Sequence, residues 1–163
     1  MDVSRAIRHL STPGWIVRGV FPESALANIE AAIASTERTH GGEVRFAVEG
    51  NLNAGELWRN VSARERALEV FARLGVWDTD ANNGVLIYVL WADHDVEIVA
   101  DRGFNGRVSS DEWAAVCHVM EQHFRSGNAQ QAVIEGIKSV GALIAKHFPA
   151  IDRNELPDRP VML

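Results

Sequence analysis

Six oxygen-bearing side chains stand beside the segments of this sequence that are predicted to form strands, and together they could bind a hard cation. Four belong to one loop: Asp78, Asp80, Asn82 and Asn83. Asp101 follows a later predicted strand, and Glu43 opens an earlier one. Carboxylate and amide oxygens in such a mixed set suit Ca²⁺ or Mg²⁺. Asp and Asn are also residues that turns prefer, so the spacing alone leaves an ordinary turn open as the alternative.

Two more specific interpretations of this loop fail on the sequence. An EF-hand calcium loop has its glycine at the sixth position and a bidentate Glu at the twelfth. Counting from Asp78, Gly84 comes one residue late and Val89 occupies the twelfth position. An aspartyl-phosphate nucleophile requires an Asp at the exposed end of a strand, whereas Asp78 follows a predicted helix and precedes a predicted strand.

Arg102 and Arg45 are the basic residues beside these carboxylates. A guanidinium group can hold a phosphate through two hydrogen bonds, so Arg102 is a candidate phosphate or anion ligand. An ion pair between Arg102 and the adjacent Asp101 is the simpler alternative. Gly103 and Gly106 do not make a phosphate loop, because the segment lacks the Walker lysine and the dinucleotide fingerprint.

Histidine and cysteine chemistry finds little support in the sequence. His40 lies nearest the acidic cluster, at the predicted end of a helix, where a histidine that faces water is the expected role. Cys117 falls on the apolar stripe of a predicted helix and is expected to be an inert core thiol. No Ser or Cys paired with a His is recognisable, so a hydrolytic triad has no support.

The strands that would position these residues follow from the hydrophobic pattern. Val85–Leu90 is an unbroken apolar run, which predicts a strand buried on both faces. Val96–Ala100 comes after a short polar turn and should pair with it as a hairpin. Glu43–Glu49 alternates, with Arg45 and Glu49 on the polar face, which predicts a half-buried strand.

Helices are predicted before the first strand, between the first and second strands, and after the third strand. Their signals are a short helix over Ser4–Leu10 stopped by Pro13-Gly14, a helix from Pro22 to His40–Gly42, capping boxes at Ser62–Glu65 and Ser109–Glu112, and a last helix that ends at Pro149. Residues 51–55 are expected to be a loop. The tail, residues 150–163, has prolines and no period, and is expected to be extended, either draped on the surface or frayed.

This order of elements predicts one α/β domain over residues 1–163. Its architecture should be a helix–sheet–helix sandwich with a small mixed β-sheet, made of one βαβ unit and an antiparallel hairpin strand. The parallel strands would start at the end of the sheet where the third strand finishes. We therefore expect Glu43, Asp78 and Asp101 to lie at one end of the sheet.

Composition narrows the class of protein. The net charge of −6 argues against nucleic-acid binding and against attraction to anionic membranes. A single cysteine excludes an intrachain disulfide and a cysteine-rich zinc site. No secretory leader and no apolar run long enough to cross a bilayer are visible, so we expect a cytoplasmic location without direct membrane insertion.

Several short motifs, taken in order, resemble the TPM domain family, named for its thylakoid, photosystem-repair and nematode receptor-accessory members. They are His40–Val44, Phe71–Gly75, Asn82–Ile87, Val96–Ile98, Phe124–Gly127 and His147–Pro149, and they span about residues 22–149. The resemblance implies a mixed sheet sandwiched by helices. It also implies divalent-cation binding and acid phosphatase activity, as in plant thylakoid members, or an accessory role beside membrane-tethered proteins. Many members carry a leader and a membrane anchor, which this chain does not show.

Two functions from different classes follow from these observations. The first is a soluble binding or accessory module with an acidic site for Ca²⁺ or Mg²⁺, whose partner is a membrane-anchored relative or another protein. The second is a metal-assisted acid phosphatase acting on phosphomonoesters. A purely structural partner of a membrane-anchored relative is a third possibility. Basic groups beside the carboxylates would favour the phosphatase, because a phosphate dianion needs positive charge.

Overall fold

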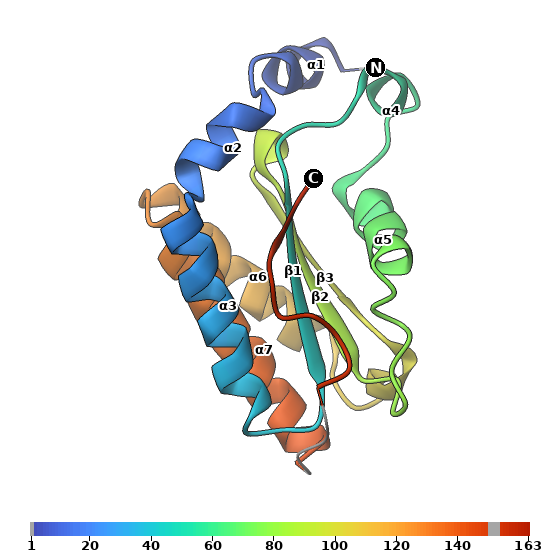
Figure 1. Ribbon diagram of the computed structural model, residues 1–163. Coiled ribbons are helices and arrows are strands. Elements are labelled where there is room, and N and C mark those ends of the chain that lie inside the picture. The colour runs from blue at the N-terminus through green and yellow to red at the C-terminus, as the bar shows by residue number, and fades with distance from the viewer. Residues whose placement is uncertain (1, 150–153) are drawn as a thin grey trace.

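The computed structural model describes residues 2–149 and 154–163, which form a mixed sheet with helices on both faces (Figure 1). The strands are β1 (Glu43–Glu49), β2 (Gly84–Leu90), β3 (Asp95–Ala100) and β4 (Val161–Met162), in the order β3-β2-β1-β4. The helices are α1 (Val3–Leu10), α2 (Gly14–Val20), α3 (Glu23–Glu37), α4 (Ala54–Trp58), α5 (Ala63–Arg73), α6 (Ser110–Arg125) and α7 (Ala129–His147). Two 3-10 turns, η1 (Trp91–Asp93) and η2 (Arg102–Phe104), follow β2 and β3. The predicted fold class is confirmed.

β2 is the interior strand that its apolar run predicts. It pairs in parallel with β1 on one side and antiparallel with β3 on the other. All seven of its residues are buried. The capping boxes at Ser62 and Ser109 begin α5 and α6 as expected.

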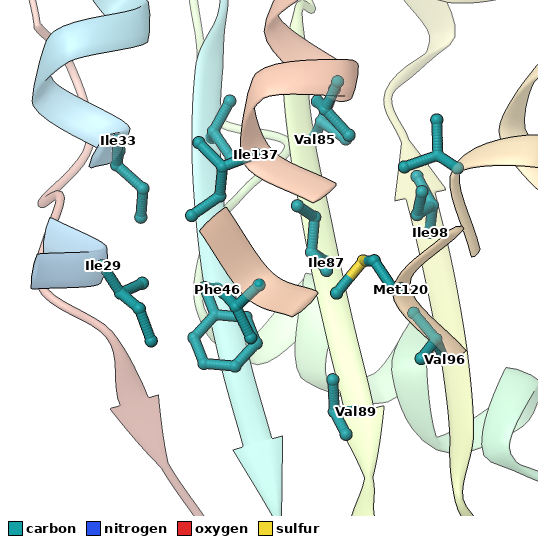
Figure 2. Packing of buried hydrophobic residues seen from close by; sticks show 14 of the residues in the cluster. Ile29, Ile33, Phe46, Val85, Ile87, Val89, Val96, Ile98, Met120 and Ile137 are labelled. Atoms are coloured by element: carbon teal, nitrogen blue, oxygen red, sulfur yellow. The ribbon is translucent and has the colours of Figure 1, made fainter. Parts of the chain in front are cut away.

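The two faces of the sheet carry separate hydrophobic cores. On one face the apolar side chains of β1, β2 and β3 pack under α3, α6 and α7. Figure 2 shows this face, with Ile29, Ile33 and Ile137 over Phe46 and Ile87. On the other face, α5 covers Leu86, Tyr88 and Leu90 of β2. Full burial of a side chain of this size contributes about 1.5–3 kcal/mol, so both layers are needed to hold the central strands.

The prediction that β1 is half-buried is wrong, because all seven of its residues are buried. Its polar face is covered by α5 and by the C-terminal tail. Glu49 accepts a hydrogen bond from the Tyr88 hydroxyl (2.6 Å) and two from the Arg66 guanidinium (both 2.8 Å). A buried carboxylate is stable here because charged and polar partners satisfy its oxygens.

Three further segments differ from expectation or go beyond it. Residues 14–20, for which no element was predicted, form α2 directly after Pro13. The stretch expected to be a loop, 51–55, contains the start of α4, which begins at Ala54 with a capping box between Asn53 and Glu56. The described part of the tail, 154–163, is extended as predicted and adds β4 in parallel to the free edge of β1. The rest of the predicted tail, 150–153, lies outside the described residues.

None of the helices in the described part of the chain is both long enough and apolar enough to span a membrane.

Candidate functional site

The starts of β1 and β2 and the finish of β3 lie at one end of the sheet. Glu43 pairs with Gly84 across the parallel strands, and the backbone N–H of Asp101 donates to the Gly84 carbonyl at 2.9 Å. One row across the sheet therefore contains Glu43, Gly84 and Asp101 in that order. Adjacent strands lie about 4.8 Å apart, so about two strand spacings separate the two acidic residues.

The chain that leads into β2 lies over the middle of this row. A Cβ atom on Gly84 would overlap the carbonyl group of Val76, so only glycine fits where the chain crosses. Gly103 is crowded in the same way by the carbonyl groups of Ala81 and Asn82, and its N–H donates to the Asn82 oxygen at 2.9 Å. The polar loop before β2 is therefore packed directly against η2, the turn after β3.

Two buried oxygens in this region accept no hydrogen bond from any described residue: Asn83 Oδ1 and Asp101 Oδ2. The Asn83 side chain is buried, and its amide nitrogen donates to the Gly41 carbonyl. That bond fixes the orientation of the amide, because the reversed amide would place two oxygens together. Asp101 Oδ1 accepts from the backbone N–H of Arg102 at 2.7 Å. A bound cation would satisfy oxygens of this kind.

The other predicted ligands of the loop are more exposed. Asp78 and Asp80 have exposed side chains. The backbone N–H of Asp80 donates to the carboxylate of Glu155 in the tail, at 3.1 and 3.4 Å from its two oxygens. The tail therefore contacts the loop through Glu155. The sequence of the tail has no hydrophobic periodicity and did not indicate this contact.

The guanidinium group of Arg102 donates from Nε to Asn82 Oδ1 at 2.7 Å, rather than to the carboxylate of Asp101. The expected alternative of an ion pair with Asp101 is therefore not what the structure has. Asn82 adopts a left-handed backbone conformation, with φ of 53°, which asparagine tolerates better than most residues. Arg102 remains exposed at the rim of the loop, whereas Arg45 is only 6% exposed.

Glu43 is occupied by the tail. Its two carboxylate oxygens accept from the backbone N–H groups of Glu155 and Leu156, each at 3.1 Å. Burial raises the pKa of Glu43, and these two hydrogen bonds oppose that rise. Glu43 would have to release the tail before it could bind a cation.

Within residues 2–149 and 154–163, no group of three or more His, Cys, Asp and Glu side chains lies close enough to hold a metal ion. A cation at this end of the sheet would therefore depend on amide and carbonyl oxygens beside its carboxylates. Ca²⁺ and Mg²⁺ accept such ligands, and soft metals do not favour them.

A second group of ionisable residues, which sequence reasoning missed, gathers under the tail. A cavity of about 270 Å³ there is lined in part by Glu37, Glu43 and Asp158. Glu37 accepts from the backbone N–H of Val44 at 2.7 Å. Burial raises the pKa of Glu37 to about 8, and the nearby Glu43 and Asp158 carboxylates add to the rise. Asp158 comes from the tail, so local sequence could not place it beside the end of α3.

The expectation that His40 faces water is wrong, because its side chain is buried. Its Nδ1 accepts from the Gly42 N–H at 3.2 Å, and burial lowers its pKa. His40 therefore orders the chain between α3 and β1. For Cys117, burial raises the thiol pKa to about 12, which fits the expected inert thiol.

Comparisons with known proteins agree with this architecture. A family model described as the TPM domain matches residues 17–143. The NMR structure of the BA42 protein from the psychrophilic bacterium Bizionia argentinensis is 32% identical, with a TM-score of 0.75 over 86% of this chain and 93% of that one. A search of the curated proteins gave no match.

Two more distant structures share the fold alone. The N-terminal domain of a P. gingivalis protein is 17% identical, with a TM-score of 0.65 over 84% of each chain. The N-terminal domain of the cg2496 protein from Corynebacterium glutamicum is 12% identical, with a TM-score of 0.54 over 86% of this chain and 78% of that one. The family-model match and the 32% identity over most of both chains together show that this chain belongs to the TPM domain family.

Proposed function

We propose that this chain is a TPM-domain binding module that takes Ca²⁺ or Mg²⁺ in the loop where β2 begins. The observation that carries the proposal is the pair of buried oxygens, Asn83 Oδ1 and Asp101 Oδ2, that no described donor satisfies. Asp101 supplies the negative charge, and Asn83 supplies a neutral oxygen held in place by Gly41. Asp78 and Asp80 add exposed carboxylates from the same loop.

Glu43 and Asn82 have supporting roles in this proposal. Glu43 holds the tail, whose Glu155 in turn holds the backbone of Asp80. Asn82 fixes the turn before β2 and binds Arg102. The cation would then order a surface made of the polar loop and the tail, and a protein partner, such as a membrane-anchored relative, would recognise that surface in its ordered form.

The direct test is a calorimetric titration of the full chain with Ca²⁺ and with Mg²⁺ after treatment with chelator. The wild type should bind one of these ions, and Asp101→Asn should lose at least tenfold in affinity. Asparagine can still accept from the Arg102 N–H, so the variant removes the charge and leaves the turn. Asp111→Asn, an exposed change in the first turn of α6, is the matched control. Equal affinity in Asp101→Asn and in the control would rule out this site.

A metal-assisted phosphatase is the second candidate, and one observation favours it. Arg102 is exposed at the rim of the same loop, where it could exchange Asn82 for a phosphate oxygen while the cation polarises the phosphoryl group. The name of the matching family model also includes the word phosphatase. Arg45 cannot assist, because it is buried and bonded to the Arg159 carbonyl of the tail at 3.3 Å.

Because Arg102 is the one exposed arginine described between residues 78 and 102 to meet a phosphate dianion, the binding module is the better supported function. Hydrolysis of p-nitrophenyl phosphate, measured with each cation and with chelator, separates the two. Cation-dependent turnover that falls at least a hundredfold in Arg102→Ala would favour the phosphatase. Turnover that is equal in wild type and in Asp101→Asn would exclude the loop as its centre.

A further inference from the structure

Helix α1 packs against the rest of the protein with its charged side. The Arg5 guanidinium donates to Asp93 Oδ2 (2.7 and 2.9 Å) and to the Val61 carbonyl (2.8 Å). His9 is 0% exposed. Its Nδ1 accepts from the Leu52 N–H at 2.9 Å, so its Nε2 carries the proton and donates to Asp93 Oδ1 at 3.0 Å. These bonds fix which face of α1 is turned inward.

The apolar side of the same helix consequently faces water. Val3, Ile7 and Leu10 are 65%, 61% and 76% exposed. They are spaced four and three residues apart, so they form one stripe along the helix. An ordinary surface helix buries such a stripe and exposes its charges. In α1 the polar side faces inward and the apolar side faces water, and the buried hydrogen bonds of Arg5 and His9 stabilise this orientation.

Two exposed tryptophans lie on other helices at the same end of the molecule. Trp15 of α2 is 69% exposed and Trp58 of α4 is 75% exposed. The Arg5–Val61 bond ties α1 to the chain just after α4, and all three helices gather at one end of the sheet in Figure 1. Of the eight large apolar residues found to be exposed in the described chain, five lie on α1, α2 and α4. We call these five residues the apolar end.

The charge around the apolar end is positive, although the whole chain carries −6. Arg8, Arg18 and Arg59 are exposed on or beside the three helices. Helices α1 and α2 contain no Asp or Glu. The acidic residues that do lie here are Asp93, which is paired with Arg5 and Arg8, Asp2, which caps α1, and Glu56 of α4, which is buried and paired with Arg66. The negative net charge therefore does not exclude an anionic partner at this end.

We propose that the apolar end is a docking surface for an anionic lipid bilayer, with α1 lying flat among the headgroups. Short amphipathic helices with apolar and aromatic residues on one side and arginines beside them bind membranes in this way. Tryptophan favours the interface, and each nearby arginine is attracted to the negative surface potential. In a symmetric contact between two copies of the chain, this positively charged surface would face an identical positively charged surface, which disfavours self-association as the role of this face.

The orientation that results is specific. Asp93 follows β2, whereas the polar loop precedes β2, so the apolar end and the candidate cation site lie at opposite ends of the sheet. A protein docked by its apolar end would present the acidic loop away from the lipid. The inference does not depend on cation binding, because the two regions share no residue.

The test is co-sedimentation of the full chain with vesicles of pure phosphatidylcholine and of phosphatidylcholine with 30% phosphatidylglycerol. The wild type should bind the anionic vesicles at least tenfold more tightly than the neutral ones, and 0.5 M NaCl should weaken that binding. Ile7→Ser with Leu10→Ser should reduce binding to anionic vesicles at least tenfold. The control, Leu68→Ser with Val119→Ser, removes two exposed apolar residues from α5 and α6 and should change binding less than twofold.

Thermal melts without lipid should be the same for wild type and both variants, since all four side chains are exposed. Brominated lipid should quench the tryptophan fluorescence of the wild type. The variant with Trp15→Phe and Trp58→Phe should lose that quenching. Equal binding of the Ile7/Leu10 variant and the control would overturn the proposal. An absence of vesicle binding would also overturn the proposal. The same holds if the wild type binds no vesicles and sediments as a dimer that the Ile7/Leu10 variant abolishes, because the apolar end would then be a contact between copies of the chain.

Discussion

Occupation of the proposed cation site should raise the free energy of unfolding by an amount that can be calculated. An unsatisfied buried acceptor costs about 1–3 kcal/mol, and the site has two, Asn83 Oδ1 and Asp101 Oδ2. A cation that binds only the folded state raises the free energy of unfolding by about 2.7 kcal/mol at a hundredfold excess over Kd. That gain is similar in size to the cost of the unsatisfied acceptors. For a chain of this length, that energy corresponds to a rise in Tm of about 5–11 °C.

The measurement is a thermal melt in chelator and in millimolar Ca²⁺ or Mg²⁺, for wild type and for Asp78→Asn combined with Asp101→Asn. The double variant should stay folded and lose the shift, because it removes the exposed carboxylate of Asp78 and the half-buried carboxylate of Asp101 and keeps their shapes. An unchanged wild-type Tm, with cation well above a millimolar Kd, would leave the loop an ordinary turn. A shift that survives in the double variant would place the cation elsewhere.

Three further changes test the buried polar groups. Arg66→Ala should destabilise the fold by about 3–5 kcal/mol in a urea melt, because Glu49 would be left buried without its charged partner; a loss below about 1 kcal/mol would contradict this. Tyr88→Phe should cost about 1.5–3 kcal/mol by the same assay, since it removes one bond to that carboxylate, and the double variant should lose less than the sum of the two. Glu37 has its pKa raised to about 8 in the folded state, so the fold binds more protons than the unfolded chain and should lose stability as pH rises from about 4.5 to 8. Glu37→Gln should flatten that loss, most clearly between about pH 7.5 and 8, where His40 is largely neutral in both states; an equal slope in wild type and variant would refute the assignment.

The central strands and their direction could be predicted from local patterns. An unbroken apolar run marks β2, and two capping boxes mark the starts of α5 and α6. A strand, a helix and a second strand imply a parallel pair, which places Glu43 and Gly84 opposite each other. Each of these features depends on residues close together in the chain, and for that reason the sequence is informative about them.

The polar face of β1 could not be predicted in the same way. Alternation reports the polarity of side chains, and polarity usually coincides with exposure to water. Arg45 and Glu49 are polar and buried: the tail accepts one hydrogen bond from Arg45, and the side chains of Arg66 and Tyr88 satisfy Glu49. Those partners lie between 17 and 114 residues away along the chain, so local sequence patterns cannot predict these contacts.

Local sequence patterns also could not predict which acidic residues belong to the candidate site. The reason is one place where the backbone crosses over the end of the sheet. Gly84 lies between Glu43 and Asp101 in their row across the sheet. It has no side chain, and the Val76 carbonyl occupies the space that a Cβ atom would need. That crossing lies between two carboxylates that the strand order places in one row, two strands apart. Glu43 is left to bind the tail through the N–H groups of Glu155 and Leu156, and Asp101 is left beside the polar loop with one buried oxygen unsatisfied. In the proposed function a cation would bind beside Asp101, whereas Glu43 holds the tail, and Glu155 of the tail connects the two regions through the Asp80 backbone.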